Sequence, residues 1–96
     1  MLFAFICTDK PDSAEIRQKF REGHMANMKG LGTALKFAGP FLNDAGAPCG
    51  SLFVIDTPDR NAAQQIANRD PYCQNLFSSV DIRPWKWAIN NPEAPA

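Results

Sequence analysis

The chain is poor in the residues that mark disulfide-rich and metal-binding proteins. It has one histidine, His24, and three cysteines, Cys7, Cys49 and Cys73. An odd number of cysteines without a Cys-x-x-Cys pair argues against a disulfide framework and a structural zinc site, and favours a reducing cytoplasm. A single histidine without a clustered pair of carboxylates supplies too few ligands for a metal. We therefore expect neither a metal nor a cofactor.

An excess of charge and a long hydrophobic run are also missing. Ten basic residues balance ten acidic ones. A protein that neutralises many phosphates has a basic excess, so we expect no nucleic-acid partner. No apolar stretch approaches the roughly 20 residues that span a bilayer, so we expect the protein to have no membrane partner. The opening MLFAFICTDK lacks a basic segment before its short apolar part, and we interpret it as a first strand, not a signal peptide.

What remains is the composition of an ordinary globular protein. Hydrophobic residues make up 45% of the 96 positions and charged residues 21%, which suits one domain with a modest core. We expect that domain to cover residues 1–90 and a flexible tail to cover 91–96. Because so small a core supplies limited apolar burial, a homodimer is expected.

Short apolar runs alternate along the chain with stretches of helical periodicity. The runs are rich in aromatic and β-branched residues, as strands are, and the periodic stretches repeat apolar residues every three or four positions. Gly39-Pro40 interrupts the second run, so that strand is expected to end, bulge or lie at a sheet edge there. The predicted elements are a strand at 2–8, a helix at 14–31, strands at 33–41 and 51–57, a helix at 59–68, and a strand at 78–89.

The segments between these elements carry turn and capping residues. Asp12 or Ser13 is expected to cap the first helix, and Thr57 followed by Pro58 is expected to begin the second. The remaining connections are a loop at 42–50 and a junction at 69–77 that contains one short helical turn after its proline.

The order βαββαβ predicts an α+β, ferredoxin-like fold with one four-stranded antiparallel sheet and two helices on one face. Aromatic residues alternate within the predicted strands, and alternation sends such residues to a common face while the residues between them face the other way. Both faces then carry apolar side chains, and two sheets packed face to face would bury the second one. The alternating aromatic residues are Phe3, Phe5, Phe37, Phe53, Trp85 and Trp87.

His24 lies on the apolar stripe of the first predicted helix, four residues after Phe20 and four before Met28. One interpretation is a core histidine whose ring nitrogens bond to neighbouring carbonyls. The other is a general acid or base that a carboxylate orients. Asp70 is a candidate for that carboxylate because Pro71 holds it outside helical geometry, although a turn or capping aspartate suits the same position. Spacing alone leaves both interpretations open.

Three further polar residues are candidates for binding a substrate. Ser51 begins the third predicted strand, although Gly-Ser is common there and no Gly-x-Ser-x-Gly elbow is present. Arg17 lies near the helical face of His24. Its side chain is either solvated or binds an anion. Tyr72 either packs in the interior or contributes to a pocket. Cys73 is interpreted as structural, because no cation is assured beside it to activate the thiol.

Several strings of this sequence occur together in the YciI-like (YCII-related) family of small dimeric α+β-barrel proteins, and the chain resembles that family from Met1 to about Ile89. Each string is weak alone, but their order and spacing are specific. The strings are MLFAFICTDKPDS, the arginines and histidine of the first helix (Arg17, Arg21 and His24), FAGPF, GSLFVID, ANRDPY and DIRPWKWAI.

The resemblance implies a ferredoxin-like protomer, a dimer with packed sheets, and a site made of His24 and Asp70 with Ser51 nearby. It implies acid–base chemistry on small cyclic or aromatic breakdown intermediates, such as proton transfer, isomerisation or dehydrochlorination. His24 would act as base and then acid, and Asp70 would fix its tautomer. Arg17, Ser51 and Tyr72 would bind the substrate. The alternatives are a non-catalytic dimeric module that binds a metabolite or partner, and a heme-handling monooxygenase with His24 as ligand.

Overall fold

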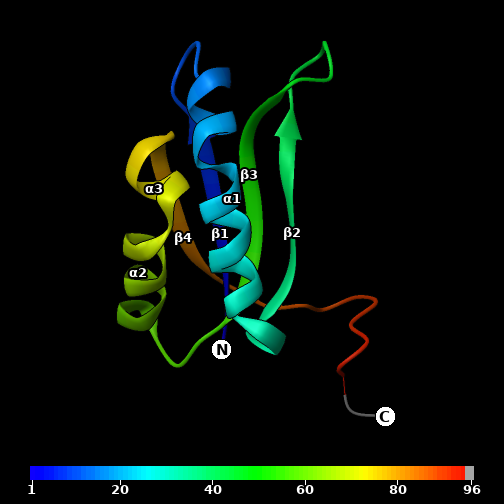
Figure 1. The fold of residues 1–96 in the computed structure, drawn as a ribbon. Helices are drawn as coiled ribbons and strands as arrows, with labels where there is room; N and C mark the ends of the chain where they lie inside the picture. Colours follow the sequence, from blue (N-terminus) through cyan, green and yellow to red (C-terminus); the bar gives the residue numbers. More distant parts are fainter. Residues whose placement is uncertain (95–96) are drawn as a thin grey trace.

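Four antiparallel strands form one sheet, and the helices lie on one of its faces, in a computed structural model that describes residues 1–94 (Figure 1). The strands lie side by side in the order β2-β3-β1-β4, and every neighbouring pair is antiparallel. The predicted ferredoxin-like fold is confirmed. The elements are β1 (Leu2–Asp9), α1 (Ala14–Gly30), a 3-10 turn η1 (Gly32–Ala34), β2 (Leu35–Leu42), β3 (Pro48–Asp56), α2 (Arg60–Arg69), α3 (Pro71–Asn75) and β4 (Phe77–Trp85).

The core lies between the helices and one face of the sheet. Phe3 and Phe5 on β1 pair in register with Ile55 and Phe53 on β3, so the four side chains share that face. All four are 2% exposed or less, and the rings of Phe5 and Phe53 stack with centroids 4.8 Å apart. The helices cover them with Met28, Ala63, Ile66, Ala67 and Tyr72, and Leu76, which follows α3, belongs to the same core.

The prediction that the six alternating aromatic residues share one face is wrong. Phe3, Phe5 and Phe53 face the helices, whereas Trp85 pairs in register with Leu2 and Phe37 with Val54, on the opposite face. The physical reason on β2 is a register shift between Leu35 and Phe37, because an extra residue reverses the alternation. The rings of Trp85 and Trp87 lie at 5.8 Å and 5.2 Å from that of Phe37.

Several predicted boundaries differ from the structure where pairing decides them. β4 ends at Trp85 and not at residue 89, because Trp85 already pairs with Leu2, the first residue of β1. β3 begins at Pro48 and not at residue 51, because the β2–β3 hairpin extends beyond β1, and the predicted loop at 42–50 shortens accordingly. Residues 33–34, predicted as strand, belong to η1.

The helix caps also differ from the predictions. Asp59, and not Thr57, caps α2, because β3 extends to Asp56 and the Asp59 carboxylate then accepts a hydrogen bond of 2.8 Å from the Ala62 N–H. Ser13 is the N-cap residue of α1 but makes no side-chain capping bond. The predicted short helical turn after Pro71 is confirmed as α3.

The chain beyond β4 crosses toward β2 (Figure 1), where Glu93 forms an ion pair of 2.9 Å with Lys36. Flexibility of residues 91–96 stays a prediction, and residues 95–96 lie outside the described part of the chain. No helix within residues 1–94 is long and apolar enough to cross a membrane.

Candidate active site

His24 and Asp70, separated by 46 positions, meet in the interior. The His24 Nδ1 atom lies 2.9 Å from both carboxylate oxygens of Asp70. Asp70 is completely buried and His24 is 8% exposed. The imidazole comes from the middle of α1 and the carboxylate from the junction of α2 with α3. Tertiary packing therefore joins the two residues that the resemblance paired.

The local sequence positions Asp70. Because Pro71 follows it, Asp70 takes an extended backbone (φ −82°, ψ 126°) that ends α2 and begins α3. Its carboxylate accepts a hydrogen bond of 2.8 Å from the Tyr72 N–H. Gly23 allows the Pro71 ring to approach α1, since a Cβ atom there would lie 3.0 Å from the proline Cγ. This close approach places the carboxylate beside His24.

The hydrogen bonds around Asp70 define the tautomer of His24. Besides the Tyr72 N–H, the carboxylate accepts a bond of 2.9 Å from Asn27 Nδ2. A carboxylate surrounded by donors acts as an acceptor only, so we assign the imidazole proton to Nδ1. Nε2 then carries the lone pair, and no residue in the described range 1–94 forms a hydrogen bond with it.

Tyr72 covers one face of the imidazole. The two rings are almost parallel, at 9°, with centroids 4.0 Å apart. The Tyr72 hydroxyl donates a hydrogen bond of 3.1 Å to the backbone carbonyl of Arg17. Burial raises the pKa of Tyr72, against the opposing charges of Arg17 and Arg21, so the phenol stays protonated and donates. Tyr72 thus restrains both the imidazole and α1.

Arg17 links α1 to the sheet. Its Nε and Nη2 atoms donate to the two oxygens of Asp9 at 3.1 Å and 3.0 Å, a bidentate ion pair that is mostly buried. Nη2 also donates to the Gly50 carbonyl at 3.0 Å and to Ser51 Oγ at 3.4 Å. A Cβ atom at Gly50 would collide with the Cys7 carbonyl, so glycine is required where β3 passes β1. Arg17 Nη1 has no hydrogen-bond partner among residues 1–94.

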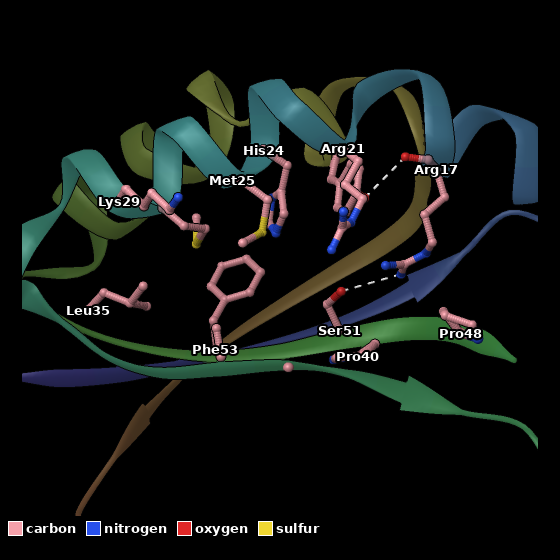
Figure 2. A pocket seen from close by; sticks show the side chains of 14 residues that line it. Arg17, Arg21, His24, Met25, Lys29, Leu35, Pro40, Pro48, Ser51 and Phe53 are labelled. Atoms are coloured by element: carbon pink, nitrogen blue, oxygen red, sulfur yellow. Dashed lines mark hydrogen bonds between the residues drawn. The ribbon is translucent and has the colours of Figure 1, made fainter. Parts of the chain in front are cut away.

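These groups open onto a pocket of about 460 Å³ between α1 and strands β2 and β3. In Figure 2 His24 points from α1 toward the sheet, and Arg17 and Ser51 lie at one end of the same space. Of the predicted site residues, His24, Arg17, Ser51 and Tyr72 line the pocket, and Asp70 lies behind His24. The apolar part of the lining is formed by Met25, Met28, Leu35, Ala38, Pro40, Pro48 and Phe53.

The fold and the family can be compared with known proteins. The model of the YCII-related domain matches residues 1–86. The chain belongs to the YCII-related family. Protein YciI from Escherichia coli O6:H1 (strain CFT073) is 34% identical over 95 residues, which cover 90% of this chain and 97% of that protein, and Protein YciI from Shigella flexneri matches equally.

Among solved structures, this YCII-related chain is similar to 5-chloro-2-hydroxyhydroquinone dehydrochlorinase (TftG) from Burkholderia phenoliruptrix AC1100, in complex with 2,5-dihydroxybenzoquinone. The TM-score is 0.80 at 24% identity, over 90% of this chain and 94% of that one. The likeness shows a shared fold.

Sequence reasoning missed three residues of this YCII-related site. Asn27 lies three positions after His24 on α1, and Asp9 ends β1; both bond to predicted site residues. Arg21 lines the pocket between Arg17 and His24. Helical spacing was a signal for Arg21 and Asn27, because residues three and four apart share a helix face. No local signal pointed to Asp9, which lies on another element.

Two of the three cysteines, Cys7 and Cys73, are held as thiols. Burial and the charge of Asp70 raise the pKa of the Cys73 thiol to about 12, and burial also raises the pKa of Cys7. Thiols held in the protonated form are poor nucleophiles. Within residues 1–94, no group of three or more histidine, cysteine, aspartate or glutamate side chains is arranged to hold a metal ion.

Proposed function

We propose that this YCII-related protein is an enzyme that transfers protons on a small ring compound, with His24 as the general base and then the acid. One observation carries the proposal: His24 Nδ1 contacts both oxygens of a buried aspartate at 2.9 Å, while the same ring lines a pocket of about 460 Å³. A base held in one tautomer beside a cavity is suited to general acid–base catalysis.

The chemistry starts at the free Nε2 lone pair. Nε2 takes a proton from a ring carbon or hydroxyl, and the Asp70 carboxylate stabilises the imidazolium that forms. In an isomerisation, His24 returns that proton to a second ring position. In the dehydrochlorination of a chlorinated hydroquinone, a hydroxyl proton first moves to the chlorine-bearing ring carbon and gives the keto form. His24 then removes a second hydroxyl proton, the electrons of that O–H bond form a C=O bond, and chloride leaves with the electrons of the C–Cl bond. His24 then releases the proton to water, and the net products are the unsaturated ring, chloride and a proton.

The other pocket residues bind and enclose the substrate in this proposal. Arg17 Nη1 and Ser51 Oγ, at one end of the pocket, bind an oxygen substituent as negative charge develops on it. Tyr72 forms a wall, since its hydroxyl already donates to the Arg17 carbonyl. The bound quinone and the dehydrochlorinase activity named for TftG support a ring-shaped substrate and an elimination here.

We also propose that the protein is a cytoplasmic homodimer joined through the sheet face opposite the helices. Ala4 and Val54 are buried there, but Leu2, Ile6 and Leu52 are only half-buried and Trp85 is 38% exposed. An apolar face of this kind favours association with a second copy. Light scattering coupled to gel filtration gives the mass, and a monomer at micromolar concentration contradicts the dimer.

The enzyme function is tested by the release of chloride from chlorinated hydroquinones and by deuterium exchange at ring carbons of unchlorinated hydroxyquinones. We expect His24→Gln and Asp70→Asn each to lower the rate about 10²–10⁴-fold, as for loss of an acid–base group. Gln65→Ala, at an exposed position of α2, is the control and keeps the wild-type rate.

Three results would contradict this function. Equal rates for wild type and His24→Gln would remove the imidazole from the chemistry. Binding of these compounds without turnover by any form would favour the alternative, a non-catalytic binding module. A Soret band after heme addition that His24→Gln abolishes would favour the heme-handling alternative.

A further inference from the structure

Positively charged side chains gather around the pocket, although the chain as a whole has no net charge. Ten basic and ten acidic residues balance in the sequence. The lining of the pocket nevertheless includes Arg17, Arg21 and Lys29 and no aspartate or glutamate. Asp70 does not line the pocket; it lies behind His24, with which it forms a hydrogen bond. Charged groups gathered in a cleft with apolar walls raise the local concentration of ligands of the opposite sign.

The three cations differ in whether the protein already neutralises them. Asp9 pairs with Arg17 through two hydrogen bonds. Within residues 1–94, the side chains of Arg21 and Lys29 form no ion pair and no hydrogen bond. Arg21 is also the cation next to the reactive group, since it precedes His24 by one helical turn. Figure 2 shows its guanidinium directed from α1 into the space above Ser51.

The spacing along α1 matches the dimensions of a small ring. At a rise of about 1.5 Å per residue, Arg21 lies about 4.5 Å along the helix axis before His24, with Arg17 about 6 Å before Arg21. An oxygen substituent bound at the arginines therefore leaves the ring itself opposite His24. Apolar side chains, among them Phe53 and Met28, line the space on that side.

We propose that the substrate is an anion: a ring compound whose negatively charged oxygen, as a carboxylate or a phenolate, binds Arg21 together with Nη1 of Arg17. Arg21 is then a specificity-determining residue. This inference rests on the proposed function, because the substrate is the one that His24 deprotonates. A guanidinium presents a planar pair of donors that matches a carboxylate and also binds a single anionic oxygen.

Isothermal titration with charged and neutral probes of equal shape tests the inference. The first pair is 4-hydroxybenzoate and 4-hydroxybenzamide, which differ in the charge of one group. The second is 4-nitrophenol below and above the pH of its own ionisation, which separates a phenolate from a carboxylate. We expect the anionic member to bind wild type about 10–100-fold more tightly, as for a hydrogen bond to a charged group. If only 4-hydroxybenzoate binds tightly, the group that the site recognises is a carboxylate. If only the nitrophenolate binds tightly, that group is a phenolate.

Substitutions assign the preference to Arg21. Arg21→Gln is expected to fold, because the position is exposed and glutamine is a good helix former. It should abolish the preference for the anion and leave the affinity for 4-hydroxybenzamide unchanged, and Arg21→Lys should restore the preference in part. Lys19→Gln, an exposed position of α1 that does not line the pocket, is the charge-matched control and keeps the full preference.

Equal binding of the charged and neutral probes to wild type overturns the inference, as does a preference that survives Arg21→Gln, or failure of every probe to bind. These binding results are independent of turnover. If His24→Gln abolishes turnover while Arg21→Gln leaves the anion preference intact, the proposed function stands and the anionic substrate is rejected. If the preference depends on Arg21 but turnover never depends on His24, the anion site stands and the enzyme function is rejected.

Discussion

Replacing Asp70 with asparagine tests how the buried carboxylate controls His24. The substitution preserves the size of the side chain but replaces two acceptor oxygens with one oxygen and one NH₂ group. The Tyr72 N–H, which donates to Asp70 at 2.8 Å, belongs to the backbone and cannot reverse its direction. The asparagine oxygen must therefore stay on that side, where the present oxygen also lies 2.9 Å from His24 Nδ1, and its NH₂ group must take the place of the oxygen that contacts both His24 Nδ1 and Asn27.

The magnitude follows from the three hydrogen bonds that Asp70 accepts. A bond to a charged group contributes about 1.5–3 kcal/mol and a neutral one about 0.5–1.5 kcal/mol. The losses are partly offset, because a neutral amide costs less to bury than a carboxylate. We expect a net loss of about 1–3 kcal/mol in the free energy of unfolding. In a domain of this size each kcal/mol lowers Tm by about 4–8 °C.

The tautomer of His24 should change as well. The amide oxygen is a weaker acceptor than the carboxylate and already accepts from the Tyr72 N–H, so we expect the NH₂ group to donate to Nδ1. Nδ1 then accepts, the imidazole proton moves to Nε2, and the lone pair toward the pocket is lost. His24 is the only histidine, so nitrogen NMR of the neutral imidazole reports this one ring without assignment. We expect the proton on Nδ1 in wild type and on Nε2 in Asp70→Asn, with the loss of turnover given above.

Asn27→Ala is the matched control for Asp70→Asn. It removes one hydrogen bond of 2.9 Å to the carboxylate and leaves the contact between His24 and Asp70 in place. Stability should fall by about 1 kcal/mol while the tautomer stays unchanged. An unchanged tautomer in Asp70→Asn would refute the reasoning, whatever the change in Tm, because the carboxylate would then not determine which nitrogen carries the proton.

Three further predictions concern the packing beside the site and the cysteines. Gly50→Ala should destabilise the protein by about 1–3 kcal/mol in urea denaturation, because the new Cβ meets the Cys7 carbonyl. Gly30→Ala is the control and should lose no stability, because a Cβ atom there lies in open space. Equal urea midpoints for the two variants would contradict this prediction. Iodoacetamide should modify Cys49, which is exposed, before the buried Cys7, and labelling of Cys7 in the folded state would count against its raised pKa. Because the pKa of Cys73 is about 12 in the folded protein against an ordinary 9.0, the unfolded chain loses this proton first, and this contribution to stability should fall as the pH rises from 9.0 toward 12. Replacing Cys73 with alanine should flatten that part of the pH profile of stability.

The order of elements was predictable from sequence because it depends on local patterns. Apolar runs and helical periodicity placed every strand and both long helices, and the order βαββαβ led to the ferredoxin-like sheet. Pro71 correctly predicted a break and a short helix after Asp70. Boundaries were less accurate, because a strand ends where its partner ends, as β4 does at Trp85 opposite Leu2.

The sequence was enough to place Arg17 near the helical face of His24, since this depends only on spacing along one helix, whereas Arg21 was noted only in a string that carries the family resemblance. The family resemblance added Asp70 as the partner of His24. That the two touch could not be deduced from the sequence, because contacts between distant residues depend on how the helices pack, here on the approach of Pro71 to Gly23. Packing also decided that Asp9 neutralises Arg17 while Arg21 stays unpaired within residues 1–94, and this difference underlies the proposed preference for an anion.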